Sequence, residues 1–174
     1  MKGIIFDLDG TLIDSLEDIA INCNKVLKDL GFQTHEINDY KKFVGDGART
    51  LLKNALPTCD DKTLDEALEL FKKYYEHSLQ NNTKPYENIN ELLEILNSDQ
   101  NIKLAILSNK PDKFTKLYAN KLFANIDFMQ ISGQVDLIPK KPDPTLALEI
   151  IKKMNIEKKD IYFIGDTSTD MKTA

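Results

Sequence analysis

The sequence has little of what marks secreted, membrane-spanning or nucleic-acid-binding proteins. Only two of its 174 residues are cysteine. Because Cys23 and Cys59 have no CxxC-type spacing, we expect reduced thiols rather than a disulfide or a zinc site. Apolar runs are only a few residues long, so we expect no membrane span and no signal-peptide core. Basic residues form no stripe and the net charge is −5, which argues against nucleic acid as a partner. We therefore expect a cytoplasmic protein.

What is present has the composition of a globular protein, with 41% hydrophobic and 29% charged residues. The length suits one domain, or one domain carrying a smaller insert. Between residues 15 and 83, apolar residues recur every three or four positions. This spacing predicts long helices over 16–30 and 64–79, the second reaching Leu79, with shorter helical segments around the turn at residues 45–47. The stretch shows no strand pattern.

The rest of the chain alternates between strands and helices. The pattern predicts strands at 3–6, 103–107, 126–131 and 161–164, and helices at 88–98, 112–123 and 144–154. Such alternation is typical of a Rossmann-like α/β fold with a mostly parallel sheet and right-handed crossovers. We therefore predict an α/β core over residues 1–14 and 84–174, with an all-helical insert over 15–83 after the first strand.

Polar residues gather where the predicted strands end. They are Asp7, Asp9, Gly10 and Thr11 after the first strand, Ser108, Asn109 and Lys110 after the second, Lys141 in a Lys-Pro-Asp-Pro segment, and Asp166 and Asp170 after the last. Ligands of open α/β sheets bind beyond the carboxyl ends of the strands, so we expect these residues to meet. Taken singly, each segment also fits an ordinary turn or a helix cap. Because these segments occur together, at the ends of successive predicted strands, they favour a functional site.

The residue types at these strand ends suit phosphoryl chemistry. Several carboxylates form the oxygen shell that Mg²⁺ prefers. A carboxylate can attack phosphorus, while a second one handles protons. A lysine and a hydroxyl can hold the transferring group, and a glycine at residue 10 lets the backbone approach an anion. The sequence therefore predicts phosphoryl transfer to an aspartate.

The same residues resemble the motifs of the haloacid dehalogenase superfamily of phosphohydrolases. The resemblance implies Asp7 as nucleophile and Mg²⁺ ligand, and Asp9 as the acid and base whose backbone carbonyl also binds Mg²⁺. It further implies that Ser108 and Lys141 hold the phosphoryl oxygens, with Asn109 close by. The remaining metal ligands would be Asp166 and Asp170.

The helical insert resembles the small α-helical cap of that superfamily, and residues 43–49 and 107–111 are most similar to phosphoglycolate phosphatases. Arg49 is the only arginine in the chain. Its planar guanidinium suits a carboxylate such as that of 2-phosphoglycolate, although a surface ion pair explains this residue equally well. The expected reaction is Mg²⁺-dependent hydrolysis of a small phosphate monoester, with 2-phosphoglycolate as the favoured substrate.

Other functions fit parts of the same pattern. A sugar-phosphate phosphatase has the same motifs, as does a phosphomutase, which passes its phosphoryl group to a sugar instead of water. Outside the enzymes, the alternatives are a non-catalytic scaffold and a receiver-like phosphoaspartate module. The long helical insert and the spacing of Asp7 and Asp9 oppose the receiver. We expect a monomer or a weak homodimer.

The sequence ends at Ala174, soon after Asp170. Members of the superfamily usually continue with a helix, a further strand and a closing helix. We therefore expect the C-terminal part of the core to be missing from this sequence. We also expect weaker Mg²⁺ binding than in a longer form.

Overall fold

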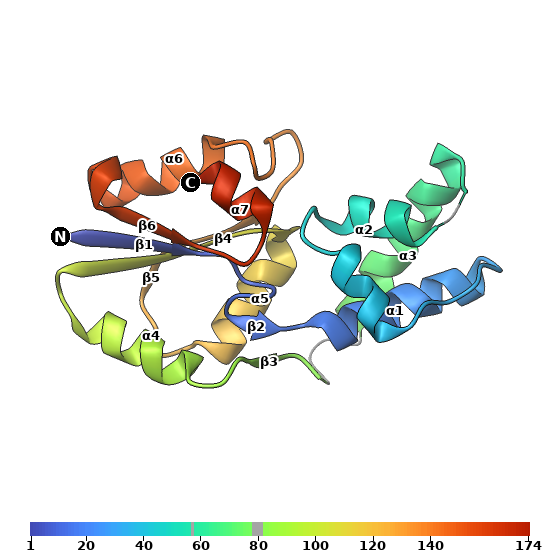
Figure 1. The fold of residues 1–174 in the computed structure, drawn as a ribbon, viewed down its shortest axis with the longest axis horizontal. Helices are drawn as coiled ribbons and strands as arrows, with labels where there is room; N and C mark the ends of the chain where they lie inside the picture. Colours follow the sequence, from blue (N-terminus) through green and yellow to red (C-terminus); the bar gives the residue numbers. More distant parts are fainter. Residues whose placement is uncertain (57, 78–81) are drawn as a thin grey trace. The chain divides into compact units, whose positions relative to one another are not determined.

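The chain forms two compact units in the computed structural model, which describes residues 1–56, 58–77 and 82–174 (Figure 1). The first unit, called here the α/β unit, comprises Met1–Ile13 and Pro85–Ala174, and the second, the helical unit, comprises Asp14–Lys84. The chain passes between them in two short paired strands, β2 (Ile13–Asp14) and β3 (Lys84–Pro85). None of the helices in the described ranges is long and apolar enough to cross a bilayer.

The α/β unit is built on one four-stranded sheet. Its strands are β1 (Lys2–Phe6), β4 (Ile102–Pro111), β5 (Phe128–Gln134) and β6 (Ile161–Ile164), in the order β5-β4-β1-β6. All three strand pairings are parallel. The carboxyl ends of β1, β4 and β6 therefore lie along one edge, as the predicted α/β fold requires.

Helices cover both faces of this sheet (Figure 1). The helices α4 (Ile89–Ser98) and α5 (Asp112–Leu122) lie on one face, and α6 (Thr145–Met154) and α7 (Ser168–Thr173) on the other, with a short 3₁₀ turn, η2 (Lys158–Asp160), before β6. Under α6 the core joins Ile5 and Leu107 of the sheet to Leu146, Ile150 and Met154 of the helix. Burial on both faces explains why β1 and β4 appear in the sequence as continuous apolar runs.

Two strands differ from their predicted bounds by more than one residue. β4 runs four residues past the apolar run that predicted it, since Pro111 still pairs with Gln134 of β5. β5 correspondingly starts and ends later than the predicted 126–131. Ser108 and Asn109 therefore lie within a strand and not after it, because backbone pairing continues where the apolar pattern stops. The strand at 161–164 has its predicted bounds.

The helical unit contains α1 (Leu16–Asp29), a 3₁₀ helix η1 (Ile37–Lys42), α2 (Ala48–Ala55) and α3 (Asp61–His77). Helix α1 packs against α3 and η1, and α2 packs against α3. α1 ends where Gly31 adopts a φ of +77° and the Phe32 N–H donates to the Leu27 carbonyl at 2.8 Å. The predicted continuation of the second long helix to Leu79 lies outside the described residues.

A buried aspartate joins the two ends of the helical unit. Asp18 of α1 is only 3% exposed and accepts hydrogen bonds from the chain where it returns to β3. The Thr83 N–H donates at 2.9 Å and its hydroxyl at 2.5 Å, while the Asn82 N–H and side-chain amide donate at 3.2 and 3.1 Å. Four donors from two consecutive residues thus saturate one carboxylate.

Candidate active site

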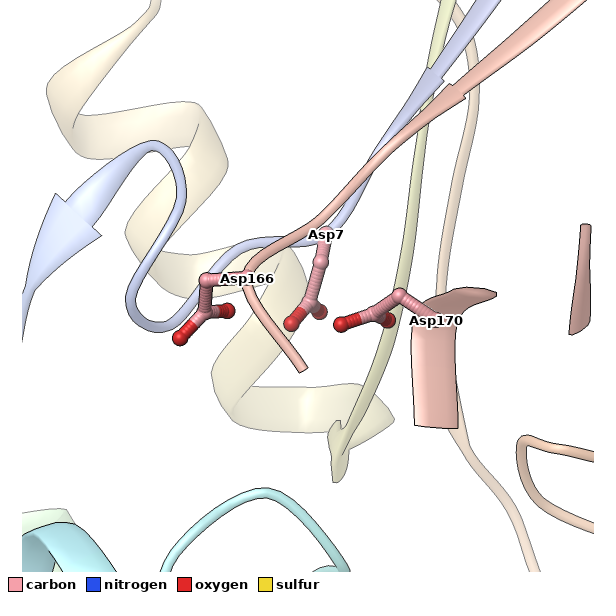
Figure 2. Close-up of side chains that lie close together, drawn as sticks. All are labelled: Asp7, Asp166 and Asp170. Carbon is pink, nitrogen blue, oxygen red and sulfur yellow. The ribbon is translucent and has the colours of Figure 1, made fainter. Parts of the chain in front are cut away.

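Three carboxylates meet at the carboxyl edge of the sheet. Figure 2 shows Asp7 after β1 lying between Asp166, which follows β6, and Asp170 of α7. Their nearest oxygens all lie within 4.8 Å of one another. The sheet produces this cluster directly, because β1 and β6 are parallel neighbours and the Asp7 N–H donates to the Ile164 carbonyl at 2.8 Å.

Asp7 is buried, and one of its oxygens lacks a hydrogen bond from the described residues. Its side chain is 9% exposed, and Oδ1 accepts no hydrogen bond within the described part of the chain. Burial raises the pKa of Asp7 to about 6, the Lys141 charge opposes this shift, and the neighbouring Asp170 adds to it. An electron-rich oxygen short of donors is what a nucleophile or a metal ligand needs.

Lys141 supplies the positive charge of the cluster. Its side chain is 3% exposed, and its ammonium lies 2.9 Å from Asp7 Oδ1 and 2.6 Å from Asp170 Oδ1. Only the contact with Asp170 has the geometry of a hydrogen bond. The buried Asn109 amide donates to the Lys141 carbonyl at 3.1 Å and so fastens the lysine segment to β4. Asn109 thus has a positioning contact that the sequence did not indicate.

Asp170 is fixed by the start of α7. Thr167 caps this helix and donates to Asp170 Oδ2 from its N–H at 3.0 Å and its hydroxyl at 2.5 Å. Burial acts to raise the pKa of Asp170, but the hydrogen bonds from Lys141 and Thr167 outweigh it and hold the pKa below its usual value. Asp170 therefore stays a carboxylate.

Asp166 is held by the turn after β1. The Thr11 hydroxyl donates to its Oδ1 at 3.2 Å, and burial raises its pKa. Gly10 lies against it with a φ of +84°, and a Cβ at this position would collide with the Asp166 carboxylate. A Cβ at Gly165 would likewise collide with Asp170. The Gly10 N–H donates to the Ile13 carbonyl at 2.9 Å, so a phosphate contact from Gly10 stays a prediction.

The cluster fits the metal that the sequence implies. Three carboxylates, one of them with a buried oxygen that accepts no hydrogen bond from the described residues, form the all-oxygen donor set that Mg²⁺ prefers. A divalent cation here would neutralise the repulsion that contributes to the raised pKa of Asp7. The ligand set of the described residues thus suits magnesium.

Asp9 and Ser108 complete the polar edge. The Asp9 carboxylate is paired with Lys110 of β4, whose ammonium lies 3.0 Å from Oδ1 and 3.1 Å from Oδ2. The buried Ser108 hydroxyl accepts a hydrogen bond from the Lys110 N–H at 3.2 Å and retains its own proton to donate. The sequence placed Lys110 at this strand end but predicted no role for it, because nothing local to the residue indicates its pairing with Asp9.

Arg49 lies in the helical unit and is paired there. Its guanidinium forms an ion pair and hydrogen bond with Asp65 of α3 and lies 3.6 Å from Asp61. The hydrogen bond to Asp65 raises the pKa of Arg49. The structure thus shows the ion pair that was one of the two interpretations of this residue.

Comparison with known proteins identifies the family. The sequence profile of the haloacid dehalogenase-like hydrolases matches residues 4–174. The chain belongs to this family. The resemblance inferred from the motifs is thereby confirmed, and the Rossmann-like parallel sheet agrees with it.

Relatives within the haloacid dehalogenase-like hydrolases carry a more specific name. A phosphoglycolate phosphatase of Aquifex aeolicus is 38% identical over 98% of this chain and 78% of its own length. One from Colwellia psychrerythraea is 34% identical over 98% and 78%. One from Pseudomonas savastanoi is 29% identical over 99% of this chain, which spans 65% of that relative.

A solved structure of similar sequence has the same fold. The crystal structure of a predicted phosphoglycolate phosphatase from Haemophilus somnus has a TM-score of 0.88 at 29% identity, covering 99% of this chain and 80% of its own. The profile match thus shows the family and the structural match shows the fold, while the similar proteins themselves carry the name phosphoglycolate phosphatase.

Proposed function

We propose that this chain is a Mg²⁺-dependent phosphatase that hydrolyses a small phosphate monoester, with 2-phosphoglycolate favoured, through a phosphoaspartate on Asp7. The observation that carries this proposal is the buried cluster of Asp7, Asp166, Asp170 and Lys141, in which Asp7 Oδ1 lacks a hydrogen bond from the described residues. The names of the relatives support the substrate.

In the proposed reaction, a carboxylate oxygen of Asp7 attacks phosphorus, and the bond from phosphorus to the ester oxygen breaks. Asp9 gives a proton to that departing oxygen and the alcohol leaves. Asp9 then takes a proton from water, which attacks the phosphoaspartate, releases inorganic phosphate and restores Asp7. Lys141 and the Ser108 hydroxyl hold the phosphoryl oxygens. When bound by Asp7, Asp166 and Asp170, Mg²⁺ supplies charge neutralisation for the transferring group.

The test is phosphate release from a panel of monoesters that includes 2-phosphoglycolate and simple sugar phosphates. With Mg²⁺ present we expect turnover that EDTA abolishes and that Asp7→Asn reduces about 10³-fold or more. Release without Mg²⁺, or full activity in Asp7→Asn, would contradict the mechanism. A requirement for a sugar bisphosphate activator would instead identify a phosphomutase, and stable phosphorylation without turnover a receiver-like module.

The same panel tests the substrate through Arg49. If this guanidinium binds the substrate carboxylate, Arg49→Ala raises the KM for 2-phosphoglycolate and leaves sugar phosphates unaffected. Asp65→Ala is the matched control, because it removes the hydrogen-bonded one of the two acidic partners and keeps the arginine. Equal preference for 2-phosphoglycolate in the wild type and in Arg49→Ala would refute the proposed role of Arg49.

The proposed partner is accordingly a small-molecule phosphate monoester rather than nucleic acid or a membrane. A cytoplasmic location and a monomeric or weakly dimeric state stay predictions from the sequence.

A further inference from the structure

A second buried lysine, Lys110, forms an ion pair with Asp9, the second aspartate after β1. The Lys110 side chain is 5% exposed, and its ammonium bridges both oxygens of Asp9, whose side chain is 24% exposed. Lys141 contacts Asp7 and Asp170 instead. Each of the two aspartates after β1 therefore has a different lysine.

Lys110 is held firmly from several sides. Its ammonium lies 5.0 Å from the centre of the fully buried Tyr118 ring. Its N–H donates to Ser108 Oγ, and its carbonyl accepts from the Thr115 hydroxyl at 3.1 Å. A lysine usually loses considerable side-chain freedom when it forms an ion pair, but packing has already restricted this one.

The Asp9 carboxylate needs such support. It follows Asp7 by two residues in a turn, and its charge adds to the raised pKa of Asp7. It is not part of the cluster formed by Asp7, Asp166 and Asp170. A carboxylate beside these three aspartates could itself become a further ligand of a bound cation. In that position it could not deliver a proton.

We propose that Lys110 is a positioning residue that holds the Asp9 side chain apart from the metal-binding aspartates, in the orientation from which Asp9, in its protonated form, gives its proton to the departing oxygen. This inference rests on the proposed function, because it assigns Lys110 a part in the transfer from the ester to Asp7. Lys110 itself transfers no proton, so arginine can replace it.

The experiment compares two substrates that differ in their leaving group. An alkyl phosphate such as 2-phosphoglycolate expels a poor leaving group that requires a proton, whereas p-nitrophenyl phosphate expels an anion that leaves without one. The ratio kcat/KM covers the steps up to phosphorylation of Asp7, so it isolates the step that Asp9 assists as an acid. General acid catalysis contributes roughly 10²- to 10⁴-fold.

For Lys110→Met we expect kcat/KM to fall about 10²-fold with the alkyl phosphate and less than tenfold with p-nitrophenyl phosphate. Lys110→Arg should keep the wild-type ratio between the two substrates. Lys103→Met is the matched control, because Lys103 lies on the same strand and its ammonium donates to the Met154 carbonyl at 2.7 Å. It should change neither value.

Two outcomes would overturn the inference while leaving the proposed function intact. One is an equal loss with both substrates in Lys110→Met. The other is an undiminished effect of Lys110→Met in an Asp9→Asn background, where no acid remains to be positioned. A wild-type protein that releases phosphate from neither substrate would overturn the proposed function itself and the inference with it. If Lys110→Met fails to fold, the same comparisons are made with Lys110→Gln, which keeps a polar side chain.

Discussion

Asp18 in the helical unit and Asp7 in the α/β unit are both buried carboxylates, but their surroundings differ. Asp18 receives hydrogen bonds from four donors of Asn82 and Thr83. Asp7 Oδ1 forms an ion pair with Lys141 but accepts no hydrogen bond of good geometry from the described residues, and burial raises the pKa of Asp7 to about 6. A saturated carboxylate stabilises the fold and has little capacity for chemistry, whereas one kept short of donors is destabilising and reactive.

The largest effect on stability is expected when Asp18 is removed. Asp18→Ala leaves the buried donors of Thr83 and the part-buried donors of Asn82 without an acceptor, so we expect a loss of about 3–5 kcal/mol in the free energy of unfolding. Urea denaturation followed by tyrosine fluorescence measures this loss. Asp18→Asn, which keeps one acceptor oxygen, should lose less. A change within about 0.5 kcal/mol in Asp18→Ala would show that the network does not stabilise the unit.

Removing the charge of Asp7 is expected to stabilise the folded protein, whereas removing Asp18 destabilises it. The folded pKa of Asp7, about 6, exceeds the ordinary value of 3.8, so the ionised form of Asp7 destabilises the folded protein. This destabilisation is complete above pH 6 and is absent well below pH 4, where Asp7 is protonated in both the folded and the unfolded state. Asp7→Asn without divalent cations should therefore be about 1–3 kcal/mol more stable at pH 7.5, and this advantage should disappear as the pH falls from 6 to 4. Urea titrations with EDTA across that range measure it. A variant less stable than the wild type at pH 7.5 would contradict the comparison.

A single donor to Asp18 should have the smallest effect. Thr83→Val removes the hydroxyl that donates to Asp18 at 2.5 Å and keeps the shape of the side chain and the N–H donor. The expected loss is about 1 kcal/mol, the typical contribution of one hydrogen bond. Thr63→Val is a comparison in the same unit, because Thr63 hydrogen-bonds Asp60 at an exposed position, where the loss of a hydroxyl should cost less. A loss as large as that of Asp18→Ala would mean that the four donors act as one unit.

Much of the fold and of the site could be predicted because the signals are local. The apolar runs at β1 and β6 and the polar residues directly after them place Asp7 and Asp166 at neighbouring strand ends. Parallel pairing then requires them to meet. The capping position of Thr167 and the collision of a Cβ at Gly165 with Asp170 explain why the last segment has this composition.

The parts that sequence could not predict depend on partners far along the chain. Asp18 looks like an ordinary acidic residue in the first turn of a helix, and its donor Thr83 lies 65 residues later. Lys110 pairs with an aspartate 101 residues before it. A lysine after an apolar run is usually solvated, so only the position of Tyr118 and Thr115 of α5 shows that this one is enclosed.

The hydrogen bonds of Asp18 also bear on how an enzyme core can accommodate a long insertion. A flexible insertion raises the entropic cost of closing the chain around it as it lengthens. Here the first helix of the inserted segment and its last residues are joined inside the segment itself. For the rest of the chain, the insertion is therefore equivalent to a short connection after β2. Such a segment could be lengthened, exchanged or transplanted between hosts at little conformational cost, provided that Asp18 and Thr83 move with it.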